Sequence, residues 1–102
     1  MSKYRNPEAD RLFQAILLLQ SVEECYDFFE DACTIKEIQE IAHRFDVACQ
    51  LDSGRSYNEI YRDTGVSTAT ICRVSRCLNY GNNGYRRAID RLKKVEESGN
   101  GI

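Results

Sequence analysis

Residues 56–78, SYNEIYRDTGVSTATICRVSRCL, contain two short predicted helices joined by a tight turn. Ser56 can cap the first helix, and Glu59, three residues later, completes a capping box. Gly65 supplies the positive φ that a sharp turn between helices requires, because a Cβ atom disfavours that conformation. Ser67 can cap the second helix, in which apolar residues recur at helical spacing. This pattern predicts a helix-turn-helix.

The expected inner side of the motif is mostly apolar. Ile60 and Thr64 mark the inner face of the first helix, and Val66 fills the corner of the turn. The second helix has an apolar stripe at i, i+3 and i+7, formed by Ile71, Val74 and Leu78. An ordinary helical hairpin within a bundle would show the same stripe, so the outer face has to separate the two interpretations.

The outer face of the second helix favours DNA recognition. At 100° per residue, it carries Ala69, Cys72, Arg73 and Arg76. Small side chains at the start let a helix enter the major groove, and arginines further along reach bases or phosphates. No acidic residue occurs from Ala69 to Leu78, whereas the solvated face of a bundle helix usually mixes Glu and Lys.

The predicted DNA-binding residues lie at the starts of the two helices and along the second one. Those expected to face bases or the nearby backbone are Thr68, Ala69, Thr70, Cys72, Arg73 and Arg76. Those expected to bind phosphates are Ser56, Tyr57, Asn58 and Ser67. The expected function is that of a sequence-specific DNA-binding transcriptional regulator, more specifically a repressor.

Composition is that of one ordinary globular domain spanning residues 1–102, with 42% hydrophobic and 29% charged residues. The longest apolar run covers residues 15–19 and is too short to cross a bilayer. The first 11 residues do not read as a signal peptide, so a cytoplasmic location is expected. Five cysteines without a CxxC pair, and a single histidine, His43, predict free thiols and no metal site.

The overall charge of −2 conceals an asymmetry along the chain. Residues 1–54 hold 5 Lys or Arg and 11 Asp or Glu, a net charge of −6. Residues 55–94 hold 9 Lys or Arg and 3 Asp or Glu, a net charge of +6. Phosphates respond to the local potential, since charges beyond about 8 Å are screened at physiological salt. The basic segment coincides with the helix-turn-helix, so the low overall pI does not exclude DNA binding.

The remaining chain predicts four further helices and no strand. Asn6 and Pro7 start the first helix, Ser21 with Glu24 caps a second, and Thr34 with Glu37 caps a long third helix over residues 35–51. Its apolar stripe comprises Ile38, Ile41, Ala42, Phe45, Ala48 and Cys49. After a loop at residues 79–84, a last helix spans about 85–97, with Tyr85, Ala88, Ile89, Leu92 and Val95 on one face.

The first two helices are too apolar for a monomer with so few partners. Their surplus consists of Leu12, Phe13, Ile16, Leu17, Phe28 and Phe29. An exposed apolar face of this size usually marks a partner surface, and a symmetric dimer covers it most simply. We therefore expect a homodimer formed through residues 7–54 and the C-terminal helix at 84–97, with the helix-turn-helix at 56–78.

Three segments carry a resemblance to a known family: CTIKEIQEIAHRFDVA, SYNEIYRDTGVSTATI and RVSRCLNYGNNGY. They lie within residues 33–85 and resemble the Trp repressor superfamily, most closely its YerC/YecD-type branch; from them we expect the resemblance to extend over nearly the whole chain. The resemblance implies an all-helical, intertwined homodimer of six-helix subunits. Its N-terminal helices interlock between subunits, and one helix-turn-helix projects from each side.

The resemblance also implies a possible effector pocket, formed by Thr34, Arg44, Arg73 and Cys77. The two arginines match those that sandwich the corepressor ring in the Trp repressor, and Thr34 matches a threonine near it. Val74 replaces the glycine that leaves room for the ring, Cys77 replaces a ligand-binding serine, and Asp31 and Cys33 replace apolar pocket residues. A valine would fill the slot, so L-tryptophan is not expected as a ligand, and no other cofactor is implied. Arg44 and Arg73 could instead pair with Glu40 or Asp63.

Other functions have weaker support in the sequence. No catalytic motif accompanies His43, and the glycines after Asn79 lack the GK[ST] ending of a phosphate-binding loop. Cys72 lies on the exposed face near two arginines, the setting of a reactive thiol, so a redox-sensing regulator is one alternative. A helical protein-interaction module without specific DNA readout is the other.

Overall fold

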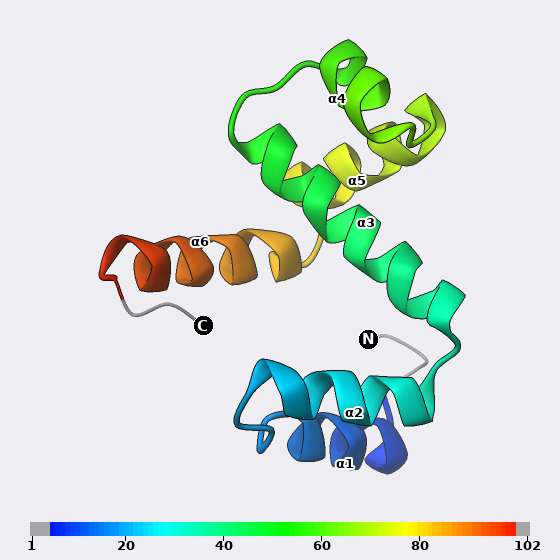
Figure 1. The fold of residues 1–102 in the computed structure, drawn as a ribbon, viewed down its shortest axis with the longest axis vertical. Helices are drawn as coiled ribbons and strands as arrows, with labels where there is room; N and C mark the ends of the chain where they lie inside the picture. The colour runs from blue at the N-terminus through cyan, green and yellow to red at the C-terminus, as the bar shows by residue number, and fades with distance from the viewer. Residues whose placement is uncertain (1–4, 100–102) are drawn as a thin grey trace. The chain divides into compact units, whose positions relative to one another are not determined.

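A computed structural model describes residues 5–99, and every regular element in that range is an α-helix (Figure 1). In chain order the helices are α1 (Pro7–Ile16), α2 (Val22–Ala32), α3 (Ile35–Asp52), α4 (Tyr57–Thr64), α5 (Thr68–Tyr80) and α6 (Gly84–Glu97). The predicted all-α, six-helix fold is confirmed. The chain divides into two compact units, unit 1 (Met1–Thr34) and unit 2 (Ile35–Ile102), which are described separately.

The helices of unit 1 begin at the predicted caps. The side chain of Asn6 accepts the N–H of Ala9 at 2.8 Å, and Pro7 follows as the first helical residue. Ser21 Oγ accepts the N–H of Glu24 at 3.0 Å. The return hydrogen bond of the predicted capping box, from the Ser21 N–H to the Glu24 carboxylate, is replaced by another. The Glu24 carboxylate accepts the N–H of Gln20 instead, at 2.9 Å.

Within residues 5–34, unit 1 has no buried core of its own. Neither α1 nor α2 contains a buried residue, and Leu12, Phe13 and Leu17 are 44%, 53% and 82% exposed. The apolar pattern continues to Leu19, but α1 ends at Ile16. Beyond it, the N–H groups of residues 18 and 19 bond to carbonyls three residues back, as in a tight turn.

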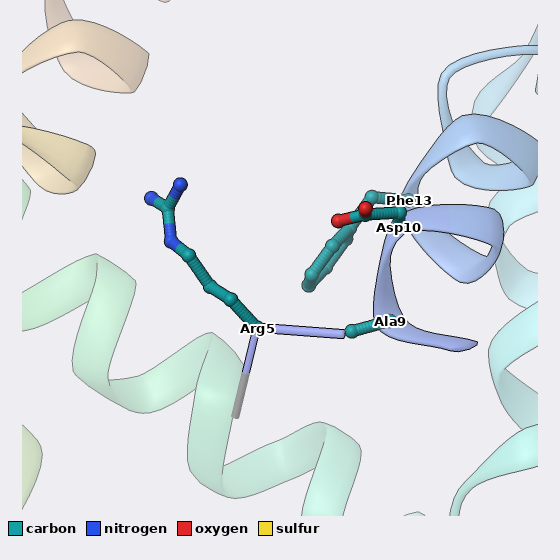
Figure 2. Close-up of a pocket in the computed structure, with 4 residues that line it drawn as sticks. All are labelled: Arg5, Ala9, Asp10 and Phe13. Atoms are coloured by element: carbon teal, nitrogen blue, oxygen red, sulfur yellow. The ribbon is translucent and has the colours of Figure 1, made fainter. Parts of the chain in front are cut away.

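The start of α1 borders a small hollow within unit 1. Figure 2 shows its lining, which consists of Arg5, Ala9, Asp10 and Phe13. The two phenylalanines of α2, Phe28 and Phe29, are only half-buried and meet edge to face with ring centroids 5.3 Å apart. The apolar surplus predicted from the sequence is therefore left largely uncovered in the single chain.

Unit 2 contains the hydrophobic core, and all four of its helices contribute to it. Each buried Ile, Val or Leu side chain contributes about 1.5–3 kcal/mol. The buried residues are Val47 and Ala48 from α3, Ile60 from α4, Ile71, Val74 and Leu78 from α5, and Ile89 from α6. Helix α5 packs against α3, α4 and α6. In Figure 1, α4 and α6 lie on opposite sides of α3 and α5. Helix α5 is thus held along one buried stripe by three other helices.

The predicted core stripes of α3 and α6 are only partly correct. Phe45, Ala48 and Cys49 pack on the core, but Ile41 is 55% exposed, and the buried Val47 lies outside the predicted stripe. On α6, Ala88 is exposed. Stripe and core differ because the first half of α3 extends beyond the other helices of unit 2 (Figure 1), and the buried residues of α3, Val47 and Ala48, lie in its second half.

An ion-pair cluster joins the end of α3 to α6. The Asp52 carboxylate accepts a hydrogen bond from Lys93 Nζ at 2.6 Å and another from the Arg86 guanidinium. Its side chain is only 9% exposed. Hydrogen bonds from Lys93 and Arg86 lower the pKa of Asp52. The hydrogen bond between Lys93 and Asp52 also raises the pKa of Lys93. The cluster fixes α6 against the helix that packs on α5.

Candidate nucleic-acid interface

The first helix of the motif starts as the sequence predicts. Ser56 Oγ accepts the N–H of Glu59 at 3.1 Å, and the Glu59 carboxylate accepts the N–H of Ser56 at 2.9 Å. This complete capping box defines the position at which α4 begins. The bonds to Ser56 lower the pKa of Glu59. Tyr57 and Asn58, the two predicted phosphate-binding residues beside the cap, are both exposed.

The turn between the helices depends on Gly65. Its φ is +74°, and its N–H bonds to the carbonyl of Tyr61 at 2.9 Å. Thr64 is exposed, so its predicted place on the inner face is wrong. Its hydroxyl donates to the carbonyl of Ile60 at 2.6 Å and accepts the N–H of Val66 at 3.1 Å. These bonds to the helix end hold the side chain away from the core.

Helix α5 is capped as predicted and runs further than predicted. Ser67 Oγ accepts the N–H of Thr70 at 3.2 Å and donates to the Thr70 hydroxyl at 3.1 Å. The helix continues to Tyr80, two residues past the predicted end at 78. It stops at Gly81, where a Cβ atom would lie 2.3 Å from the carbonyl oxygen of Cys77. Only glycine can end the helix along this path.

The two faces of α5 separate as the pattern predicts. Ile71, Val74 and Leu78 are 0%, 2% and 7% exposed, which orients the helix about its axis. Thr70 is half-buried and bonded to Ser67. The predicted DNA-binding residues that lie on the exposed surface are Ser67, Thr68, Ala69, Cys72, Arg73 and Arg76. The structure therefore brings these side chains together on one face, beginning at the N-terminal end of the helix.

The positive charge of this face is available to an external group. Within residues 5–99, neither Arg73 nor Arg76 forms an ion pair. The predicted alternative, a pair between Arg73 and Asp63, is wrong because Asp63 binds two other arginines. Arg44 likewise has no ion-pair partner, Glu40 included, in the part of the chain that the structure describes.

An arginine cluster that sequence reasoning missed anchors α4. The Arg55 guanidinium donates to Gln50 Oε1 of α3 at 2.9 Å and also pairs with Asp63 of α4. Arg62 Nε lies 3.2 Å from the same carboxylate. Hydrogen bonds from Arg55 and Arg62 lower the pKa of Asp63. No periodic pattern signals this cluster, because Arg55 lies in the linker between two helices.

The residues of the predicted effector pocket differ in burial and in the element that carries them. Arg44 is half-buried on α3, whereas Arg73 is exposed on α5. Cys77 lines a hollow at the end of α5, but neither arginine belongs to its lining, which is completed by Gly81, Asn82, Gly84 and Tyr85. Thr34 closes unit 1 and precedes the first residue of α3. Val74, which stands where the resemblance implies a glycine, belongs to the buried core.

Cys25, Cys33, Cys49, Cys72 and Cys77 are all free, and burial raises the pKa of the Cys49 thiol. In the described range, no cluster of three or more His, Cys, Asp or Glu side chains could hold a metal ion. Among the same residues, no helix is long and apolar enough to span a membrane.

Comparison with known proteins places this geometry in a family. The Trp repressor protein family matches residues 7–93. The chain is 54% identical over 96 residues to the uncharacterized protein YerC of Bacillus subtilis (strain 168), covering 94% of this chain and 92% of that protein.

Two solved structures agree in fold. The crystal structure of a TrpR-like protein from Eubacterium eligens ATCC 27750 has a TM-score of 0.85 and 53% identity, covering 89% of this chain and 94% of that chain. A crystal structure from Staphylococcus aureus has the same TM-score of 0.85 with 46% identity, covering 89% and 91%. The functional class that follows is that of a helix-turn-helix DNA-binding regulator. The chain belongs to the Trp repressor protein family.

Proposed function

We propose that this protein is a sequence-specific transcriptional repressor that binds a near-palindromic DNA site as a homodimer. One observation carries the proposal. The outer face of α5 is exposed, lacks any acidic residue and presents two arginines that have no ion-pair partner within residues 5–99. A helix held by three others along its inner stripe, with such an outer face, fits the major groove in shape and charge.

In this proposal the outer face of α5 contacts bases, and the starts of α4 and α5 contact phosphates. Thr68, Ala69 and Cys72, near the start of α5, face base edges, and Arg73 and Arg76 reach bases or the backbone. The helix starts bind phosphates. A serine hydroxyl that accepts a capping bond still has its own proton to donate, and Ser56 Oγ is in that state. Tyr57, Asn58 and Ser67 complete the phosphate-binding set.

Dimerisation is supported by the uncovered apolar surface. Leu17 of α1 is 82% exposed and Ile35 of α3 is 71% exposed, and α1 and α2 lack any buried residue. A second copy would cover these faces, as in the intertwined dimer of the family. Two-fold symmetry then requires half-sites about 34 Å apart, one turn of B-DNA.

The regulator works on DNA without catalysis and without L-tryptophan. Family membership favours a regulator over an enzyme. Val74 fills the slot for an indole ring, so any effector differs from tryptophan in shape or site. A repressor acts where the DNA is, so a cytoplasmic location is part of this proposal.

The test is selection from a random DNA pool, followed by sequencing. The proposal predicts enrichment of a single palindrome with half-sites one helical turn apart. Recovery of no motif at low salt, from a protein shown to be dimeric, would support the protein-interaction module instead. With the enriched site in hand, Arg76→Ala should lower the salt slope of binding by about one if this arginine binds a phosphate.

A further inference from the structure

The exposed side of α6 carries a row of cations with no assigned role. Arg87, Arg91 and Lys94 recur at i, i+4 and i+7, so they lie along one face about 10 Å long. The exposed Asp90 lies on the same face and borders the same hollow as these three cations, so the net charge of this face is +2. All three cations are exposed, and none forms an ion pair within residues 5–99. Their neighbours Arg86 and Lys93 are different, since both are committed to Asp52. These three residues are called the α6 cationic row below.

The α6 cationic row is poorly placed to bind the DNA that α5 reads. Helix α5 has 13 residues and is about 20 Å long. Its N-terminal end enters the groove in the proposed function, whereas α6 begins after its C-terminal end (Figure 1). The row therefore starts roughly the length of α5 away from the base-reading residues and calls for a different acidic partner.

A matching acidic row occurs on α2 of the same sequence. Glu23, Asp27 and Glu30 also recur at i, i+4 and i+7, and all three are exposed. Helix α2 contains no Lys or Arg, and within the described residues of unit 1 no ion pair forms. The α2 acidic row and the α6 cationic row thus have the same length, the same spacing and opposite charge.

Apolar stripes with the same spacing border both rows. Next to the acidic row lie Val22, Tyr26 and Phe29, of which the first two are 46% and 56% exposed. Next to the cationic row lie Ala88, Leu92 and Val95, which are exposed or half-buried. A charged edge beside an apolar stripe is the arrangement that selects partners in helix–helix interfaces.

We propose that the α2 acidic row of one protomer pairs with the α6 cationic row of a second copy, twice per dimer. This inference rests on the homodimer of the proposed function and adds to it the contact that selects the partner. Like charges would meet if two acidic or two cationic rows were brought together, so the pairing also fixes how the two copies associate.

The test uses two charge-reversed full-length proteins. One carries Glu23→Lys, Asp27→Lys and Glu30→Lys, and the other carries Arg87→Glu, Arg91→Glu and Lys94→Glu. In either homodimer, like charges face each other at both contacts, and the dimer Kd measured by analytical ultracentrifugation in low salt should rise tenfold or more. The difference should shrink at 1 M salt, where the screening length is about 3 Å.

Mixing the two variants distinguishes contacts between copies from contacts within one chain. In the mixed dimer each acidic row meets a cationic row of the other copy, so near-wild-type affinity should return. A third protein with all six reversals should dimerise like the wild type, which also controls for misfolding of either parent. Unchanged dimerisation of both single-row variants would overturn the inference, even if the α6 variant lost DNA affinity. Failure of the mixture to recover would overturn it too. A wild type that stays monomeric would instead remove the homodimer on which the inference rests.

Discussion

Replacing two isoleucines of unit 2 by alanine tests which of them is buried within one chain and which is buried only in the dimer. Ile71 on α5 is 0% exposed, and Ile41 on α3 is 55% exposed in the single chain. Each Ile→Ala change removes three carbon atoms, worth about 0.8 kcal/mol each when buried. At Ile71, the cavity adds to this loss, so Ile71→Ala should cost about 3 kcal/mol. For a unit of this size, that corresponds to a fall in Tm of about 12–24 °C.

The assay is thermal and urea unfolding followed by circular dichroism at several protein concentrations. Ile71→Ala should lower the stability by a similar amount at every concentration, because its cavity lies within one chain. Ile41→Ala should instead raise the dissociation constant of the dimer, so its effect should grow on dilution. A cost below about 1 kcal/mol for Ile71→Ala would refute the placement of α5. An effect of Ile41→Ala that is small and independent of concentration would count against burial of this surface by a second copy.

Three further outcomes follow from particular side chains. L-tryptophan should give no heat of specific binding by titration calorimetry, because a buried valine, Val74, stands where the resemblance implies a glycine; a micromolar affinity would contradict this. The stability lost in Asp52→Asn should be constant from about pH 5 to pH 9. It should shrink below about pH 4, because a lowered pKa stabilises the fold above the unfolded value near 3.9 and the contribution is lost as the pH falls through the folded pKa. If Asp52→Asn were still less stable than the wild type at pH 2, the charge of Asp52 would not be the cause of the lost stability. Gly81→Ala should lower the Tm by several degrees, because its Cβ would lie 2.3 Å from a backbone oxygen; an unchanged Tm would show that the end of α5 can readjust.

Local signals in the sequence predicted the motif accurately. Ser56, Gly65 and Ser67 act through neighbours within four residues, and each was found in the predicted role. The stripe of Ile71, Val74 and Leu78 was predicted for the same reason, because one helix face determines it. The predicted role of these surfaces in DNA binding remains a prediction.

Errors arose where contacts between helices, or hydrogen bonds of individual side chains, decide whether a residue is buried. Val47 is buried because α5 and α6 meet α3 near its end, which the spacing within α3 does not reveal. Thr64 fits the helical period, but its hydroxyl bonds to the backbone at the helix end hold it at the surface. Arg55 connects Gln50 to Asp63 across a linker, and no short motif describes such a contact.

The central claim is that the outer face of α5 reads DNA bases. Its most direct test is the affinity of Ala69→Glu for the enriched palindrome and for a scrambled duplex, measured by fluorescence anisotropy. Asn79→Glu is the matched control, since it adds the same charge to an exposed position of the same helix, about 15 Å away. Ala69→Glu should keep the wild-type Tm and lose its preference for the palindrome, whereas Asn79→Glu should keep that preference. Retention of wild-type specificity by a folded Ala69→Glu protein would contradict the claim.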